Sequence, residues 1–416
     1  MKLAALMVNY GSGAFALAAA RSLAREWLAA DLDPSDLSLI VVDQPAGTDE
    51  ERWLSELKKT GARVVHNRQN DGFAGGIQLA LEHSTGGPDD LVAVLNPDIV
   101  FLPGSIAALL ERLLVNPLAG AVAPRAWMDE GCTFQLPSPI LPTAAGELLE
   151  FGAGRLPFLA RRAAARRSKV DWEAWTAEVP IRRRMVPGAC MFLHRGVAES
   201  LEHLLDPRYP LYYEDADLCR RLAQRGLEIE LVPDANVLHH GARSSGVGQD
   251  FEAGPRTRWK QARAKYMRQY ASAPMRAGLA LADAFAAQFP RPARPAHGLK
   301  AMPLSTDPPT IPLPVGGPWC LELSLTPTFG FALGTTAPSG NWDFPVSAWN
   351  WLFAGRYYLR ALHANGKVEA AWTFAKHAPP RTEPIWDVDR TAVVDAIGKR
   401  LAGLAGVRQG RSQKCA

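Results

Sequence analysis

The stretch ARVVHNRQNDGFAGGIQLAL, residues 62–81, runs from a strand pattern through a Gly-rich turn into a helical pattern. Its apolar run has the length of a short buried strand, and Gly72, Gly75 and Gly76 stand where the helical pattern begins. Glycines at such a turn let the backbone and the helix N-terminus approach a phosphate or a sugar closely. The stretch therefore predicts a strand–helix unit with a ligand-binding turn, although an ordinary Gly-rich turn shows the same pattern.

The alternation of strand and helix continues on both sides of this unit. Strand-like apolar runs occupy residues 3–8, 37–43, 62–66, 90–95 and 119–124, with helical patterns near 14–29, 48–60, 72–84 and 103–115. Such alternation is typical of βαβ units, and it predicts an α/β fold whose mostly parallel sheet has helices on both faces. Ligands of these sheets bind at the carboxyl ends of the strands.

Further patterns follow in the second half of the chain. A strand is expected at 189–194, a helix from about Asp215, a strand at 228–232 and a helical stretch over 255–289. Nine prolines in residues 290–318 are typical of an extended linker. These patterns predict one α/β domain over residues 1–289, followed by a Pro-rich linker over 290–318.

Residues 319–416 are expected to form a small C-terminal β-rich accessory module of unknown role. Six of the twelve tryptophans lie within the last 117 residues. Asn365-Gly366 suits a two-residue hairpin turn. Counting outward from that turn gives one apolar face, which joins Tyr357, Leu359, Ala361 and His363 to Phe374, Trp372, Ala370 and Val368.

Composition excludes several classes of protein. With 47% hydrophobic and 21% charged residues the chain is neither disordered nor fibrous, and its net charge of +4 predicts no nucleic-acid partner. The five cysteines are widely spaced without a Cys-x-x-Cys pair, which favours free thiols in a reducing compartment. The first apolar run is too short for a secretory signal, and no uninterrupted apolar run is long enough to span a membrane. We therefore expect a cytoplasmic protein.

One segment, residues 155–184, is strongly basic, with nine basic residues against three acidic ones. Leu156, Phe158, Trp172 and Trp175 are interleaved with these charges. Basic residues mixed with Trp and Leu suit an anionic membrane surface, so Arg155–Arg184 is one candidate for peripheral contact at the inner face of the membrane. A solvated loop is the equal alternative.

Polar side chains lie at or just after the ends of three of the expected strands. Asp43 ends its strand, where it suits a nucleotide base or ribose, and Asn96 and Asp98 flank a proline after another strand. One or two carboxylates suffice to hold a divalent ion on a diphosphate. His239 follows a later strand and, as an imidazole, suits Mn²⁺. Plain turn acids, an Asx-turn and a core histidine are the structural alternatives.

The segment YPLYYEDADLCRRLAQRG, residues 209–226, places an acid at the start of a helix. Asp215 falls on the helix face of Leu218, Cys219 and Leu222. A carboxylate there either complements the helix dipole or acts as a general base whose pKa is tuned by partial burial.

Seven motifs in order resemble the family 2 inverting glycosyltransferases, especially the rhamnosyltransferase-like branch. They are VNYGS, VVDQ, NDGFAGGIQLAL, LNPDI, GACMFLHR, YYEDADLCRRL and HHGARSSG, within residues 1 to about 272. The resemblance implies a GT-A fold, a nucleotide-diphosphate sugar donor and Mg or Mn. Family members commonly have Asn where this chain has Gln44 and Gln78, and Asn96 replaces the first Asp of the DxD element.

The resemblance also implies a role for each matching residue. Asp215 is the implied catalytic base, and Asp98 and His239 are the implied metal contacts. The donor-binding residues are Asn9, Tyr10, Asp43, Asn70, Gly72 and Asn96. The implied reaction moves a sugar, such as rhamnose, to a glycan or lipid-linked glycan acceptor in surface polysaccharide synthesis.

Two other functions compete with this hypothesis. A non-catalytic nucleotide-sugar or glycan-binding protein needs no base, so the presence of Asp215 and Asp98 speaks against it. A nucleotidyltransferase is expected to carry a basic Gly-rich loop near its start, and VNYGSGAF, residues 8–15, contains no Lys or Arg.

Overall fold

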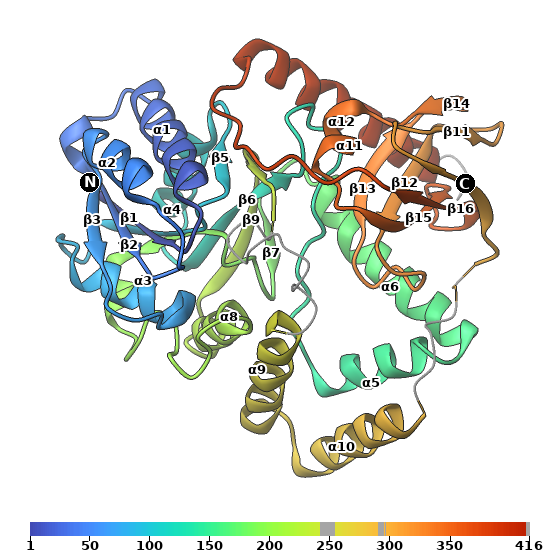
Figure 1. The fold of residues 1–416 in the computed structure, drawn as a ribbon, viewed down its shortest axis with the longest axis horizontal. Helices are drawn as coiled ribbons and strands as arrows, with labels where there is room; N and C mark the ends of the chain where they lie inside the picture. Colours follow the sequence, from blue (N-terminus) through green and yellow to red (C-terminus); the bar gives the residue numbers. More distant parts are fainter. Residues whose placement is uncertain (242–253, 290–294, 296, 413–416) are drawn as a thin grey trace.

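The computed structural model describes residues 1–241, 254–289, 295 and 297–412 of the chain (Figure 1). Its strands are β1 (Leu3–Asn9), β2 (Leu37–Asp43), β3 (Arg63–His66), β4 (Leu91–Leu95), β5 (Ile99–Phe101), β6 (Ala119–Trp127), β7 (Ile181–Arg183), β8 (Cys190–His194), β9 (Glu228–His239), β10 (Lys300–Ser305), β11 (Thr310–Leu313), β12 (Trp319–Ser324), β13 (Leu333–Ala337), β14 (Gly340–Asp343), β15 (Gly355–Leu362) and β16 (Val368–Lys376). Its helices are α1 (Gly13–Ala29), α2 (Glu51–Lys59), α3 (Gly72–Glu82), α4 (Ser105–Val115), α5 (Ala144–Ala153), α6 (Pro157–Trp175), α7 (Arg195–Glu199), α8 (Glu214–Gln224), α9 (Gly254–Tyr270), α10 (Ala273–Gln288), α11 (Val346–Trp351) and α12 (Arg390–Ser412).

A nine-stranded sheet organises the first part of the chain, in the order β3-β2-β1-β4-β8-β6-β9-β5 with β7 beside β9. The strands β3, β2, β1 and β4 pair in parallel, and so do β6 and β9. Strand β8 runs antiparallel between β4 and β6, and β5 and β7 run antiparallel to β9. The predicted α/β class is confirmed, and the sheet is mixed, because four of its strand pairings are parallel and four are antiparallel.

Strand β1 shows why helices cover both faces of this sheet. Leu3 and Met7 belong to a buried cluster that includes Leu23 of α1, whereas Leu6 and Val8 alternate with them and join a second cluster with α3 and α8. A strand with both faces covered reads as a continuous apolar run because successive side chains point to opposite faces. All five apolar runs predicted in residues 1–125 form strands.

The C-terminal region is β-rich, as predicted, but it begins earlier than expected. Its main sheet has the order β10-β16-β15-β12-β13, and β11 pairs with β14. Strand β10 pairs in parallel with β16, and both β10 and β11 lie in the range assigned to a linker. Prolines are compatible with edge strands, which explains why the Pro-rich sequence did not indicate them.

The predicted hairpin is present, with one correction at its turn. Tyr357 pairs with Phe374, and Leu359 pairs with Trp372, as the register count requires. A register shift after Ala361 then pairs Leu362 with Val368, and His363 is linked to Lys367 by a backbone hydrogen bond. The connection is therefore longer than a two-residue turn.

The two β-containing regions share one hydrophobic core. Phe15, Trp127 and Leu238 from the first region are buried in the same cluster as Trp342 and Phe374 from the second. The structure therefore does not show a separate accessory module on an extended linker. Sequence periodicity gives the buried face of an element but not the element against which that face packs.

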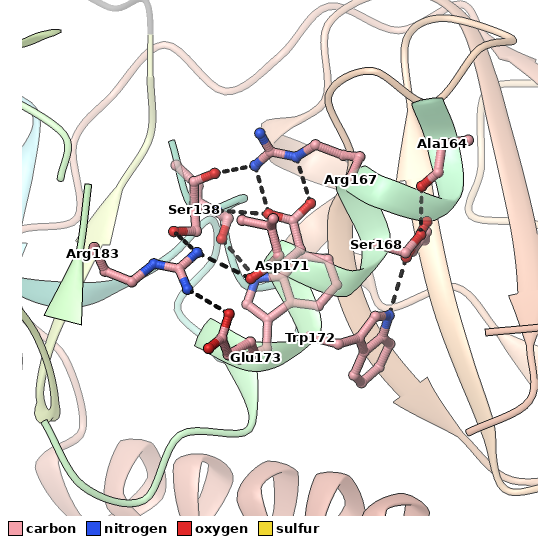
Figure 2. A network of polar contacts seen from close by, with 12 residues as sticks. Ser138, Ala164, Arg167, Ser168, Asp171, Trp172, Glu173 and Arg183 are labelled. Carbon is pink, nitrogen blue, oxygen red and sulfur yellow. Dashed lines mark hydrogen bonds and ion pairs between the residues drawn. The ribbon is translucent and has the colours of Figure 1, made fainter. Parts of the chain in front are cut away.

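The Arg-rich stretch forms helix α6 and strand β7 rather than a loop. Figure 2 shows that Arg167 pairs with Asp171 four residues later, with Nε 2.7 Å from Oδ2. Arg183 of β7 donates to Oε2 of Glu173 at 3.0 Å. These cations stabilise the local structure and are not free for a membrane.

The tryptophans of the same stretch are buried. Trp172 and Trp175 pack with Cys320 and Leu362 of the C-terminal sheet. A Cβ atom at Gly334 would lie 2.2 Å from the Trp175 ring, so only glycine allows this close approach. The prediction that these tryptophans face a membrane is wrong, because α6 buries them against β12 and β15, and local sequence patterns do not reveal this contact.

The described part of the chain contains no helix that is both long and apolar enough to cross a membrane. Cys132, Cys190 and Cys219 are buried free thiols, and Cys320 is also buried. Cys415 lies outside the described residues.

Candidate functional site

The carboxyl ends of β1 and β2 bring Asn9 beside Asp43. Asn9 Nδ2 donates to Asp43 Oδ1 at 2.8 Å, and its Oδ1 accepts hydrogen bonds from the backbone and hydroxyl of Ser12. Asn9 is completely buried, so the structure shows it holding Asp43 rather than open to a nucleoside. Asp43 retains 17% side-chain exposure, and the exposed Tyr10 follows Asn9 along the chain.

The Gly-rich turn is clamped from the end of β2. Gln44 accepts a hydrogen bond from the Asp71 backbone at 2.7 Å and donates to the Gly72 carbonyl at 2.8 Å. Gly72 has a φ of +75°, and a Cβ atom there would lie 2.4 Å from the carbonyl oxygen of Pro210. Asn70 is exposed and accepts from the Gly72 backbone. The turn is thus fixed against the segment that leads into α8.

The turn between β4 and β5 carries Asn96 and Asp98. Antiparallel pairing of β5 with β9 places Ile99 opposite His239, and Nε2 of His239 lies 3.5 Å from Asp98 Oδ1. Asp98 is 2% exposed. Burial raises its pKa, but the charges of His239 and His240 outweigh that effect and hold the pKa below its ordinary value.

Asp98 and His239 are the candidate donor pair for a hard divalent ion. Oδ1 of Asp98 is buried and has no hydrogen-bond partner among the described residues. No cluster of three or more His, Cys, Asp or Glu side chains suited to a metal is found there either. A site with few protein ligands fits Mg²⁺ or Mn²⁺, because such ions bind through one or two carboxylates together with substrate phosphates and water.

Asp215 lies in the first turn of α8. It accepts hydrogen bonds from the backbone of Ala216 at 2.8 Å and of Gly188 at 3.3 Å. Tyr212 and Tyr213 both adopt positive φ values before it, an uncommon conformation that recurs at functional sites. Burial raises the pKa of Asp215 above the ordinary value for aspartate. A carboxylate with a raised pKa suits the role of a general base.

Two adjacent residues connect Asp215 to the β4–β5 turn. Gly188 donates its backbone N–H to Asp215, and the carbonyl of Ala189 accepts from the backbone of Asn96. A Cβ atom at Gly188 would lie 3.0 Å from Cβ of Asp215, so this close approach favours glycine. The structure therefore brings together the candidate base and the turn that carries the candidate metal ligand.

Glu214 is a site residue that the sequence analysis missed. It is 8% exposed, and its buried Oε2 has no partner among the residues described. Burial and the neighbouring Asp215 raise its pKa well above the ordinary value. The signal in the sequence was the pair of consecutive acids after two tyrosines. Asp217, by contrast, is fully buried and bonded to Arg221 and Tyr270, which indicates a structural role.

The C-terminal region also reaches this site. Trp351 of α11 stacks on His240 at a ring-centroid distance of 3.7 Å and an interplanar angle of 11°. His240 follows the candidate metal ligand His239 at the end of β9. No local sequence signal indicated this contact. Residues 242–246 of the HHGARSSG motif lie outside the described residues.

A comparison with protein families bears on the first part of the chain. A profile described as "Glycosyl transferase family 2" matches residues 5–175. These residues are therefore similar to glycosyl transferase family 2, and they are called the family 2 region below. Asp215 and His239 lie beyond the matched residues.

Two curated relatives support the same family and the rhamnosyltransferase-like branch. Both are named N-acetylglucosaminyl-diphospho-decaprenol L-rhamnosyltransferase, from Mycobacterium tuberculosis strains CDC 1551 / Oshkosh and ATCC 25618 / H37Rv. Each is 35% identical over 162 residues, which is 38% of this chain and 49% of the relative. The chain thus spans about half the length of the curated relatives it matches.

Solved structures with a similar fold are more distant from this chain in sequence. A mannosyltransferase, PcManGT from Pyrobaculum calidifontis in complex with GDP-Man and Mn²⁺, is 15% identical with a TM-score of 0.36, over 69% of this chain and 80% of that one. S. aureus TarS 1-349 is 9% identical with a TM-score of 0.38, over 65% and 73%. Neither likeness is close enough to bear on the reaction of this chain.

Proposed function

We propose that this chain is an inverting glycosyltransferase that moves a sugar from a nucleotide-diphosphate donor to a glycan or lipid-linked glycan in surface polysaccharide synthesis. One observation carries the proposal: Asp215 and the β4–β5 turn with Asp98 are both hydrogen-bonded to residues 188–189. The names of the curated relatives support rhamnose as the transferred sugar and a lipid-linked acceptor.

The proposed reaction is a single displacement. Asp215 accepts the proton of an acceptor hydroxyl while that oxygen attacks the anomeric carbon from the face opposite the diphosphate. The new glycosidic C–O bond forms as the bond to the diphosphate oxygen breaks, and the nucleoside diphosphate leaves with the electron pair. No enzyme nucleophile is required, and the configuration at the anomeric carbon inverts.

Asp98 and His239 are the residues that would hold the divalent ion of this reaction. A bound Mg²⁺ or Mn²⁺ supplies stabilisation of the negative charge on the leaving diphosphate. The residues of the chain do the remaining work. The Gly72 turn, held by Gln44, places the N-terminus of α3, whose helix dipole favours negative charge, near the donor diphosphate, and Asp43 lies at the neighbouring strand end.

We expect Asp98→Ala to weaken Mn²⁺-dependent binding of the donor nucleotide by at least about 10–100-fold. A loss of this size is typical even when the residue removed only hydrogen-bonds to a metal ligand. Isothermal titration with UDP-, GDP- and dTDP-sugars, with Mn²⁺ or with EDTA, measures this change. Asp89→Ala is the matched control, because Asp89 is exposed. Equal donor binding in EDTA and in Mn²⁺ would contradict the metal assignment.

We propose that contact with a membrane is made by the start of α6 and by α10, rather than by the whole of Arg155–Arg184. Leu156 and Phe158 are exposed near the start of α6, and Phe285 is exposed on α10. The Arg155 guanidinium lies over the Phe285 ring at 5.4 Å, which joins the two helices into one surface. Arg161 and Arg162 are exposed on the next turn of α6. Cations beside apolar side chains suit an anionic bilayer, where a lipid-linked acceptor is presented.

We expect Arg161→Gln/Arg162→Gln to weaken binding to phosphatidylglycerol-containing vesicles roughly thirtyfold, since each cation near such a surface contributes about 1 kcal/mol. Co-sedimentation at low and high salt measures the effect. The control Arg52→Gln/Lys58→Gln removes two exposed charges from α2. If the wild type does not sediment at low salt, or if both variants sediment alike, the chain does not use this surface.

A further inference from the structure

A cavity of about 430 Å³ lies between the family 2 region and the C-terminal region. Its size is within the range of small-molecule sites, about 300–1,000 Å³. Helix α5, the first half of α6 and the loop after β12 form its walls. The polar residues at these walls include Glu147, Glu150, Arg166, Thr326 and Thr328, and Phe331 completes the lining beside them.

The loop over residues 326–331 is held in place by contacts on its buried side and by hydrogen bonds. Phe329 is completely buried at a φ of +54°, and the Arg360 guanidinium lies over its ring at 4.2 Å. Ser324 donates a hydrogen bond to the Phe331 carbonyl at 2.6 Å, and the hydroxyls of Thr326 and Thr328 lie 3.3 Å apart. These contacts fix the loop backbone and its two threonine hydroxyl groups before any ligand binds, which lowers the entropy cost of binding.

The cavity side chains that remain available to a ligand have no net charge. Arg167 is engaged with Asp171, and Glu147 is engaged with Arg263 at 2.7 Å. This leaves the Glu150 carboxylate and the exposed Arg166 guanidinium together with the two threonine hydroxyls.

One carboxylate, one guanidinium and two hydroxyls offer both donors and acceptors without a net charge. That inventory fits a neutral polyhydroxyl ligand better than a phosphate or a nucleotide. Phe331, which is 57% exposed, adds an apolar ring against which the C–H face of a sugar packs.

The cavity adjoins the loop of the candidate base. Burial and the carboxylate of Glu147, which lies in the cavity wall, raise the pKa of the Tyr213 hydroxyl, and Tyr213 directly precedes Glu214 and Asp215. Gly330 brings the loop against α5, because a Cβ atom there would lie 3.3 Å from Oε2 of Glu150. A ligand in this cavity is therefore close to the residues that would deprotonate an acceptor.

We propose that this cavity is a saccharide subsite for the acceptor, assembled jointly by α5, α6 and the 326–331 loop, which holds a neutral sugar unit of the acceptor glycan. The inference rests on the proposed function, since it names part of the acceptor for the same site. It also gives the C-terminal region a role in binding the acceptor.

Saturation-transfer NMR of the full chain with the free disaccharide of N-acetylglucosamine tests binding without any need for turnover. The subsite predicts signal transfer to the sugar protons, lost in Phe331→Ala and at least tenfold weaker in Glu150→Gln. Leu325→Ala is the matched control, because Leu325 is an exposed apolar residue beside the same loop that does not line the cavity. Circular dichroism melting of each variant checks that the fold is retained.

A kinetic arm separates this inference from the proposed function. With a synthetic lipid-diphosphate N-acetylglucosamine acceptor, both variants should raise the acceptor KM about tenfold and leave donor hydrolysis in the absence of acceptor unchanged. Sugar binding that is absent in the wild type, or equal in the wild type and both variants, overturns the subsite whether or not transfer occurs. Sugar binding that depends on Phe331 without any donor turnover supports the subsite and contradicts the proposed reaction.

Discussion

Replacing Asp215 with Asn should lower kcat for sugar transfer by about 10²–10⁴-fold, the contribution that is typical of a general base. The substitution keeps the size of the side chain and an oxygen that accepts from the Gly188 or Ala216 backbone. Donor binding should therefore remain within about twofold of the wild type. Acceptor-dependent release of nucleoside diphosphate measures the first quantity, and titration calorimetry measures the second.

Glu214→Gln is the matched control for this substitution. Burial and Asp215 raise the pKa of Glu214 well above its ordinary value, which favours the neutral carboxyl that glutamine resembles. Most transfer activity should survive. A larger loss in Glu214→Gln than in Asp215→Asn would reassign the base to Glu214, and transfer within tenfold of the wild type in both would remove general-base catalysis from this loop.

The pH dependence of transfer follows from the same pair. The base must be ionised to accept a proton, and burial raises the pKa of Asp215 above that of an exposed aspartate. The rate should therefore fall as the pH decreases through this raised pKa. The residual rate of Asp215→Asn should not show this fall at low pH.

The second large effect is expected from Arg360→Met, which should lower the free energy of unfolding by about 3–5 kcal/mol. Arg360 and Glu322 are each 1% exposed, and Arg360 Nε lies 2.9 Å from Glu322 Oε2. Arg360 also donates to Ser168 at 2.8 Å, and Trp172 donates to Glu322 at 3.1 Å. Removing the guanidinium leaves a buried carboxylate without its counter-charge at the junction of α6 and the C-terminal sheet.

Denaturant unfolding followed by circular dichroism measures this loss. The double variant Arg360→Met/Glu322→Gln should recover most of the stability, because no unpaired charge remains and the amide oxygen still accepts from Trp172. Lys59→Met removes one side of an exposed pair with Glu56 and should cost less than about 1 kcal/mol. A cost for Arg360→Met as small as that of Lys59→Met would show that the junction does not depend on the buried pair.

Much of the first sheet could be predicted because its strands and helices have local periodicity. Strand β1 is apolar at every position before Asn9, and the helical patterns begin at turns such as Gly72. The hairpin pairing of Tyr357 with Phe374 followed from counting outward from a turn. The packing of Trp172 on the C-terminal sheet could not be predicted, because that contact joins residues 150 positions or so apart and leaves no periodic signal.

The candidate site was predicted in part. The motifs singled out Asp98, Asp215 and His239, because these residues stand at strand ends and at a helix start. The resemblance assigned Asn9 to the nucleoside, but its amide is bonded to Asp43 and Ser12. The stacking of Trp351 on His240 and the cavity beside Glu150 depend on long-range packing. The residues of this stacked pair and of this cavity showed no sequence pattern that pointed to the site.

The anomeric configuration of the product tests the central claim most directly. The full chain is incubated with Mn²⁺, a synthetic lipid-diphosphate N-acetylglucosamine acceptor and UDP-, GDP- or dTDP-sugars, and the product is read by the NMR coupling at its anomeric proton. The account predicts transfer from one of these donors with inversion of configuration and release of one nucleoside diphosphate for each sugar transferred. Retention of configuration, or no transfer from any of the donors, would contradict a single displacement with Asp215 as the base.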